Sequence, residues 1–264
     1  MSAAAASRRS ALDGVLDART PSVTLALELF ELADAIAVQP ALRRALTDPG
    51  TPDDARADLV GALFGPRTGP DAVAVLAETA RTRWSTPREF VAALERQAVR
   101  ALLVTAQGNG ELDEVEDQLF HIERLVDAHP DLRSAISDRR SSLTARADLI
   151  GGLVDGRVLP VVAQLARRAV AAHRRTFALT VEEYLTLAAD LRSRAVATVE
   201  VARPLTDEQL DRLTTALSRQ AGRDVTVRVV VDPSVIGGAR VTLGDEVIEG
   251  TVAGRLHDAH RKLG

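Results

Sequence analysis

The sequence repeats itself at a spacing of 90 residues, and this repeat restricts the possible folds more than any other feature. Residues 39–64 align without gaps to residues 129–154, and twelve of the 26 aligned positions are identical. A period of about 90 residues is far longer than the 20 to 50 residues of a solenoid unit. The repeat therefore predicts a duplicated domain.

The apolar residues within each copy have helical spacing. Leu25, Leu29 and Leu32 recur at steps of four and three residues, which predicts the buried face of a helix that ends before Pro40. In the second copy Phe120 aligns with Phe30 of the first. Both halves therefore read as helical bundles.

Sequence signals also mark where several helices begin. Thr51-Pro52 predicts a helix with Thr51 as its N-cap and Pro52 at its first position. Thr86-Pro87-Arg88-Glu89 is a capping box that opens a long helix carrying Phe90 and Leu94. Thr206-Asp207-Glu208-Gln209 is a second capping box and predicts the start of a later helix. Leu12, Val15 and Leu16 predict one short amphipathic helix near the N-terminus.

From residue 196 the apolar period changes from 3.6 to 2, which marks a strand and a new domain. The run of β-branched residues at 225–231 predicts a central strand covered on both faces. Gly244-Asp245 predicts a hairpin that places Val241 opposite Ile248. A last helix has Val252 and Leu256 on one stripe.

Together these signals predict a mainly α-helical protein with a C-terminal α/β domain. We expect a first helical bundle over residues 1–107, a second, related bundle over 108–194, and a small β-α-β-β-β-α domain over 195–264.

Backbone geometry accounts for the glycines of the C-terminal stretch. Asp232-Pro233 ends a strand, Gly244-Asp245 forms the hairpin turn, and Gly250 precedes the last helix. Gly237-Gly238 has two readings, a phosphate cradle or a bend that enters the hairpin. No helix N-terminus follows directly, which favours the bend.

The sequence carries no catalytic motif with adequate spacing. It has no cysteine, no P-loop, no dinucleotide fingerprint and no nucleophile elbow. His257 and His260 are three residues apart, but no third metal ligand accompanies them, so solvated histidines are the better reading. We expect no enzyme activity and no cofactor, although a small transferase or hydrolase with a polar pocket remains an alternative.

Charge and hydropathy restrict the partners. The net charge of −4 argues against binding to nucleic acid. No apolar run approaches the roughly 20 residues of a spanning helix, so direct membrane insertion is not expected. These properties favour a protein that binds other proteins.

Three C-terminal segments resemble the delta subunit of bacterial F-type ATP synthase, which is related to the mitochondrial oligomycin-sensitivity-conferring protein. They are Asp232 to Gly238, Gly244 to Thr251, and Gly254-Arg255-Leu256. Many members of that family have one helical bundle before the α/β domain. The second bundle resembles the long actinobacterial form.

The resemblance implies a non-catalytic stator subunit of the peripheral stalk. Such a subunit joins the catalytic head to the membrane-anchored b subunit and resists rotor torque during proton-driven ATP synthesis, on the cytoplasmic face of the cell membrane. The alternative is a helical adaptor unrelated to ATP synthase.

The resemblance also implies two protein contacts. N-terminal segments of the alpha subunits would bind as helices in a bundle groove, for which we select Leu12, Val15, Phe90 and Leu94. The b subunit would bind the C-terminal domain, at a surface that includes Val252 and Leu256. The resemblance does not decide which of the two bundles holds the alpha segment.

Overall fold

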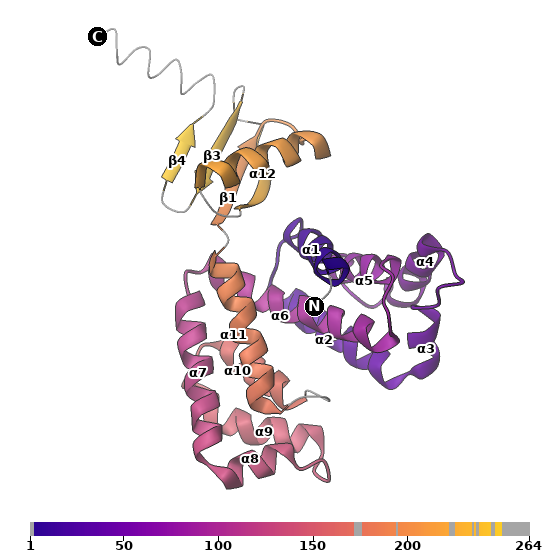
Figure 1. The fold of residues 1–264 in the computed structure, drawn as a ribbon, viewed down its shortest axis with the longest axis vertical. Coiled ribbons are helices and arrows are strands. Elements are labelled where there is room, and N and C mark those ends of the chain that lie inside the picture. The colour runs from indigo at the N-terminus through magenta and orange to yellow at the C-terminus, as the bar shows by residue number, and fades with distance from the viewer. Residues whose placement is uncertain are drawn as a thin grey trace. The chain divides into compact units, whose positions relative to one another are not determined.

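A computed structural model of the chain describes residues 3–171, 176–193, 195–221, 225–233, 235, 238–243 and 246–249. The chain divides into two units, residues 1–189 and 190–264, and each is described by itself. The first unit is helical, whereas the second contains a sheet (Figure 1). The protein is therefore mainly helical with a small C-terminal sheet.

Short connections separate the helices before the sheet. These helices are α1 Ala3–Asp17, α2 Val23–Val38, α3 Pro40–Ala45, α4 Asp53–Phe64, α5 Pro70–Arg81, α6 Pro87–Gly108, α7 Leu112–Ala128, α8 Pro130–Ser137, α9 Leu143–Val154, α10 Pro160–Ala171 and α11 Phe177–Ser193.

Capping at the helix starts follows the sequence signals with one exception. The Thr86 hydroxyl accepts a hydrogen bond from the Glu89 N–H (3.2 Å), which confirms the predicted start of α6. The prediction for α4 was wrong by one residue, because Pro52 is extended and the helix begins at Asp53. The Thr51 hydroxyl instead donates to a carboxylate oxygen of Asp48 (3.0 Å).

Pairs of packed helices build the core of the first unit. α2 packs along α6, α4 along α5, and α9 along α10, while α7 and α10 also lie in contact (Figure 1). Leu29 and Ile36 of α2, Leu76 of α5 and Leu102 of α6 have no exposed surface. Burial of these apolar side chains is the main stabilising contribution in each pair.

Helix α6 is buried on more than one face. It runs for 22 residues, and twelve of its side chains are buried, including the four consecutive residues 101–104. A helix that packs on one side only has a buried stripe at every third or fourth position. Helix α6 therefore packs against neighbours on both of its sides, which include α2, α5, α7 and α10.

The second unit contains a four-stranded sheet in the order β2-β1-β3-β4. The strands are β1 Ala195–Val201, β2 Val225–Val231, β3 Ala239–Leu243 and β4 Glu246–Glu249, with β1 and β2 parallel and the other neighbours antiparallel. Helix α12 Asp207–Ala221 lies across one face (Figure 1). Its Leu217 packs into the core of the sheet.

Strand β2 corrects one prediction. The β-branched run at 225–231 was expected at the centre of the sheet, but β2 lies at an edge, and Val230 and Val231 are 42% and 47% exposed. Strand β1 is central instead, because β2 pairs with one of its edges and β3 with the other. A run of valines suits a central or an edge strand, so the pairing of the strands determines which position β2 takes.

Two other predictions for this unit are confirmed. Val241 lies opposite Ile248 in the β3–β4 hairpin. The Thr206 hydroxyl accepts from the Gln209 N–H (3.3 Å) and the Gln209 side chain accepts from the Thr206 N–H (3.0 Å), so the predicted capping box starts α12.

Candidate functional site

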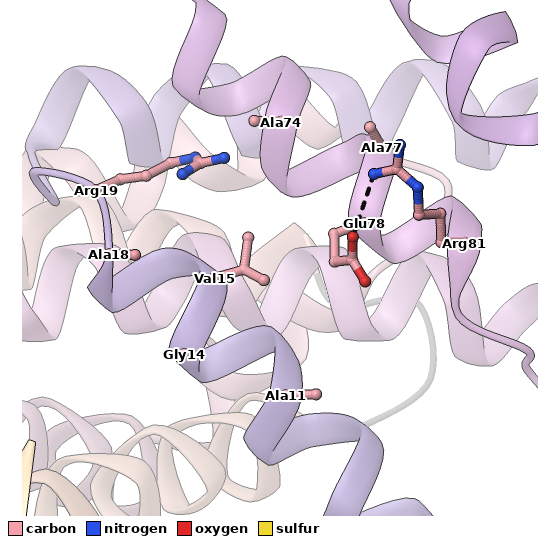
Figure 2. Close-up of a pocket in the computed structure, with 9 residues that line it drawn as sticks. All are labelled: Ala11, Gly14, Val15, Ala18, Arg19, Ala74, Ala77, Glu78 and Arg81. Atoms are coloured by element: carbon pink, nitrogen blue, oxygen red, sulfur yellow. Dashed lines mark hydrogen bonds and ion pairs between the residues drawn. The ribbon is translucent and has the colours of Figure 1, made fainter. Parts of the chain in front are cut away.

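A groove runs between α1 and α5 in the first unit. Its volume is about 540 Å³, and Figure 2 shows both helices and the side chains that line it. The lining residues from α1 and the turn after it are Ala11, Gly14, Val15, Ala18 and Arg19, and those from α5 are Ala74, Ala77, Glu78 and Arg81.

Small side chains keep this groove open. Ala74 and Ala77 of α5 face the same groove as Gly14 and Val15 of α1 (Figure 2). A Cβ atom added at Gly14 would meet no heavy atom within 4 Å. Alanine and glycine leave room for another helix to approach closely, which makes the groove a candidate site for a helix of a partner.

Buried charges fix α1, one wall of the groove, onto α6. The Asp13 carboxylate accepts hydrogen bonds from Arg96 and from the Gln97 amide (2.9 Å). Arg100 donates to both oxygens of Asp17 at 2.7 Å. Asp13, Gln97 and Arg100 are each at most 4% exposed, so α1 is held by oriented polar contacts as well as by Leu12 and Leu16.

The environment of Asp13 changes its acidity. Burial alone would raise the pKa of the Asp13 carboxyl, but the hydrogen bond from Arg96 and the positive charges of Arg96 and Arg100 lower it below its ordinary value. Asp13 is therefore ionised in the folded protein at neutral pH, and the attachment of α1 depends on that charge.

Charged side chains stand at the rim of the groove. Arg81 contacts two carboxylates, Asp54 at 3.1 Å and Glu78 at 3.3 Å. The hydrogen bonds that Arg81 donates raise the pKa of its guanidinium, and the one donated to Asp54 has the largest effect. Arg19 lies 3.8 Å from Asp71. Charged groups of both signs therefore lie in or beside the groove.

The structure separates the four groove residues selected from the sequence. Val15 lines the groove. Leu12, Phe90 and Leu94 have no exposed surface, so in this structure they belong to the core that supports α1 and not to its open face. Helical spacing identifies a buried stripe, but it does not tell whether the protein itself or a partner covers that stripe.

Sequence reasoning missed the α5 side of the groove. Ala74, Ala77 and Glu78 lie on the half-buried flank of a helix whose other flank, with Val75 and Leu76, is fully buried. The available signal is a set of small residues at helical spacing on both helices. Alanine is also the commonest helix former, so this signal is weak without the packing of α1 against α5.

Most of the residues selected in the C-terminal stretch lie outside the described part of the chain. This applies to Gly237, Gly244, Asp245, Gly250, Val252, Arg255 and Leu256. Where the structure does describe the stretch, the Asp232 N–H donates to the Val201 carbonyl (2.9 Å), Pro233 follows in a turn, and Gly238 has a φ of +98°. Positive φ favours glycine, in keeping with a backbone role.

Among the described residues, no group of three or more His, Asp or Glu side chains is placed to hold a metal ion. Within the same part of the chain, no helix is long and apolar enough to cross a membrane.

A helical unit with an open groove between two helices, followed by a small α/β unit, defines a protein-binding class of structure. Comparison with known proteins narrows that class. The family model described as ATP synthase delta (OSCP) subunit matches residues 95–263.

Curated relatives match over almost the whole chain. The ATP synthase subunit delta of Streptomyces avermitilis is 41% identical over 262 residues, which cover 98% of this chain and 96% of that protein. The protein of the same name from Cutibacterium acnes is 40% identical over 253 residues, 96% of each chain. The chain belongs to the ATP synthase delta (OSCP) subunit family.

Family membership decides between the functional alternatives. The chain is a structural subunit of the ATP synthase peripheral stalk and not a catalytic one, as the sequence predicted. An adaptor unrelated to ATP synthase is no longer a competing account. The chain is associated with a membrane through the ATP synthase complex.

Proposed function

We propose that this subunit joins the catalytic head of ATP synthase to the b subunit of the peripheral stalk and resists rotor torque. The helical unit holds the head through an N-terminal segment of an alpha subunit, and residues 195–264 hold the b subunit on the cytoplasmic face of the membrane. The groove between α1 and α5 is the observation that carries the first contact.

The helical unit is proposed to be a duplication, with copies at residues 1–107 and 108–194. Helices α3, α4, α5 and α6 begin at residues 40, 53, 70 and 87, and α8, α9, α10 and α11 begin at 130, 143, 160 and 177. Each pair is offset by 90 residues, the spacing of the sequence repeat.

Equivalent hydrogen bonds recur at the same offset. The Arg56 guanidinium donates to the Ala80 carbonyl (2.7 Å), and Arg146 donates to the Val170 carbonyl (3.4 Å). The Gly69 N–H donates to the Glu28 side chain (3.0 Å), and the Leu159 N–H donates to the Gln118 side chain (2.8 Å). Shared long-range contacts of this kind support a common ancestor for the two bundles.

One helix belongs to both copies in this proposal. The residues 90 positions after α1 are 93–107, which lie inside α6. Helix α6 would thus be the last helix of the first bundle and the first helix of the second. Its burial on more than one face supports this double role.

The first bundle is the better candidate for the alpha segment. At the positions that correspond to Ala74 and Ala77 of α5, helix α10 has Gln164 and Arg167. These longer side chains would occupy space that alanine leaves free. The open groove therefore supports the first bundle, residues 1–107, as the one that contacts the head.

A glycine-to-leucine pair tests the assignment. Gly14→Leu places a large side chain in the groove, whereas Gly61→Leu is a matched control on α4, because both glycines are exposed helical positions with no atom near an added Cβ. We expect Gly14→Leu to abolish co-purification with the catalytic head and Gly61→Leu to retain it. Unchanged head binding by Gly14→Leu would remove the groove from the proposed contact.

A further inference from the structure

Two arginines line the groove between α1 and α5, and their contacts differ. Arg81 donates hydrogen bonds to carboxylate oxygens of Asp54 (3.1 Å) and Glu78 (3.3 Å). The Nε atom of Arg19 lies 3.8 Å from a carboxylate oxygen of Asp71, a distance too long for a hydrogen bond. Carboxylates of this chain therefore hold Arg81 firmly, whereas Arg19 makes a long ion pair with a carboxylate that is itself half exposed.

One N–H group of Arg19 is left without an acceptor. The Nε atom is buried and has no hydrogen-bond partner among the described residues, although the side chain as a whole is 27% exposed. A buried N–H group that lacks an acceptor is unfavourable, and an acceptor that reaches it from another molecule removes that penalty. The unpaired N–H of Arg19 therefore indicates where an oxygen atom of a partner would bind.

Arg19 stands at one end of the groove. It lies in the turn after α1, and its side chain extends towards Ala74 of α5, while Arg81 lies at the opposite end (Figure 2). Val15 precedes Arg19 by four residues, so the two side chains are about one helical turn apart along the groove. A helix seated there would meet small apolar side chains along its length and a cation near one end.

The second bundle has no arginine at the corresponding position. Asn109 follows Arg19 by 90 residues, and its side-chain amide donates to Glu111 (3.1 Å). An amide carries no charge, so its hydrogen bond to a carboxylate is weaker than that of a guanidinium. This difference favours the first bundle for a partner helix with an acidic side chain.

We infer that the guanidinium of Arg19 recognises a carboxylate of the helix that binds in the groove between α1 and α5. The partner helix then carries Asp or Glu about one turn away from the apolar side chain that packs on Val15. The inference rests on the proposed function for the identity of the partner, an N-terminal segment of an alpha subunit. It adds the residue of this chain, and the chemistry of the partner, that make the contact specific.

Removal of the Arg19 charge in the full-length protein tests this pairing. The probe is a synthetic peptide of the N-terminal segment of the alpha subunit from the same organism, with affinity measured by calorimetry. Arg19→Gln is expected to weaken binding about tenfold, because the charge and its hydrogen bond are lost. Arg83→Gln is the matched control, since Arg83 makes an ion pair of similar length with Asp53 (3.7 Å) but does not line the groove. It is expected to bind as the unchanged protein does.

A double-mutant cycle identifies the acidic residue of the peptide. Each Asp or Glu of the peptide is replaced in turn by Asn or Gln. One replacement should weaken binding to the unchanged protein and have little further effect on binding to Arg19→Gln. If no replacement behaves in this way, or if Arg19→Gln binds as tightly as the unchanged protein, the inference is overturned.

Failure of the proposed function gives a different result. If the unchanged protein does not bind the peptide, or if Gly14→Leu binds it as tightly as the unchanged protein, the groove is not the site of the alpha segment and both proposals fall. If Gly14→Leu loses the peptide while Arg19→Gln retains it, only the role of Arg19 is overturned. Circular dichroism confirms that each variant keeps its helical content.

Discussion

The guanidinium of Arg168 covers the ring of Phe30, although 138 positions separate the two residues in the sequence. Burial alone would lower the pKa of Arg168. The hydrogen bond to Asp34 and the negative charge of Glu95 outweigh that effect and raise the pKa above its ordinary value. The arginine is therefore a permanent cation between α2 and α6, where it joins the two halves of the helical unit.

Replacement of Arg168 by methionine should weaken this joint. Methionine keeps most of the volume but removes the charge, so Asp34 and Glu95 lose their shared cation. We expect a loss of about 2 kcal/mol in the free energy of unfolding, below the full value for a buried pair because Asp34 is half exposed. Urea unfolding measures the change. Arg167→Met is the control, since Arg167 pairs with an exposed carboxylate. Equal effects of the two changes would contradict the role of Arg168 as the cation that joins α2 and α6.

Asp13 should make stability depend on pH in the acid range. Its folded pKa is lowered, so the stabilisation is present above the unfolded value of about 3.9 and is lost as the pH falls through the folded value. Asp13→Asn removes this dependence. We expect the unfolding free energies of the two proteins to differ at pH 7 and to converge towards pH 2 to 3. A constant difference across this range would argue against the pairing with Arg96 and Arg100.

Truncation should reveal the double role of α6. A protein that begins at residue 87 keeps the whole helix, whereas one that begins at residue 109 loses the apolar surface of Leu102 and Leu103. We expect cooperative thermal unfolding of the longer fragment and a melting temperature at least 10 °C lower for the shorter one. Equal melting temperatures would show that the second bundle does not need α6. The family match, which begins at residue 95, agrees with the longer boundary.

Two glycines should respond in opposite directions to alanine. Gly238 has a φ of +98°, so Gly238→Ala is expected to destabilise the second unit by about 1–2 kcal/mol. Gly152 lies in α9 with open space around an added Cβ, and Gly152→Ala should stabilise the first unit by about 0.5–1 kcal/mol. Chemical denaturation of both variants provides the measurement. Stabilisation of the second unit by Gly238→Ala would contradict the positive φ of Gly238.

Local sequence signals predicted the local structure well. The capping boxes at Thr86 and Thr206 and the hairpin register at Val241 each depend on a few neighbouring residues, and each is present in the structure. The edge position of β2 was not predicted, because it depends on which strands pair with β1.

The groove could be predicted only in part for the same reason. Val15 was selected from its helix alone, but Ala77 and Glu78 become groove residues only when α5 lies against α1. Buried contacts of Asp13 and Arg100, more than 80 residues apart, hold α1 against α6. Helical periodicity contains no information about such a pairing.

The continuity of α6 has a mechanical consequence. A helix of 22 residues extends about 33 Å, and in the proposed duplication its backbone hydrogen bonds continue without an interior proline or a loop from the first bundle into the second. Two domains joined by a flexible linker would bend at the linker under a sideways pull. In the proposed arrangement a single helix takes the place of such a linker, so we expect the two bundles to resist a sideways pull as one body.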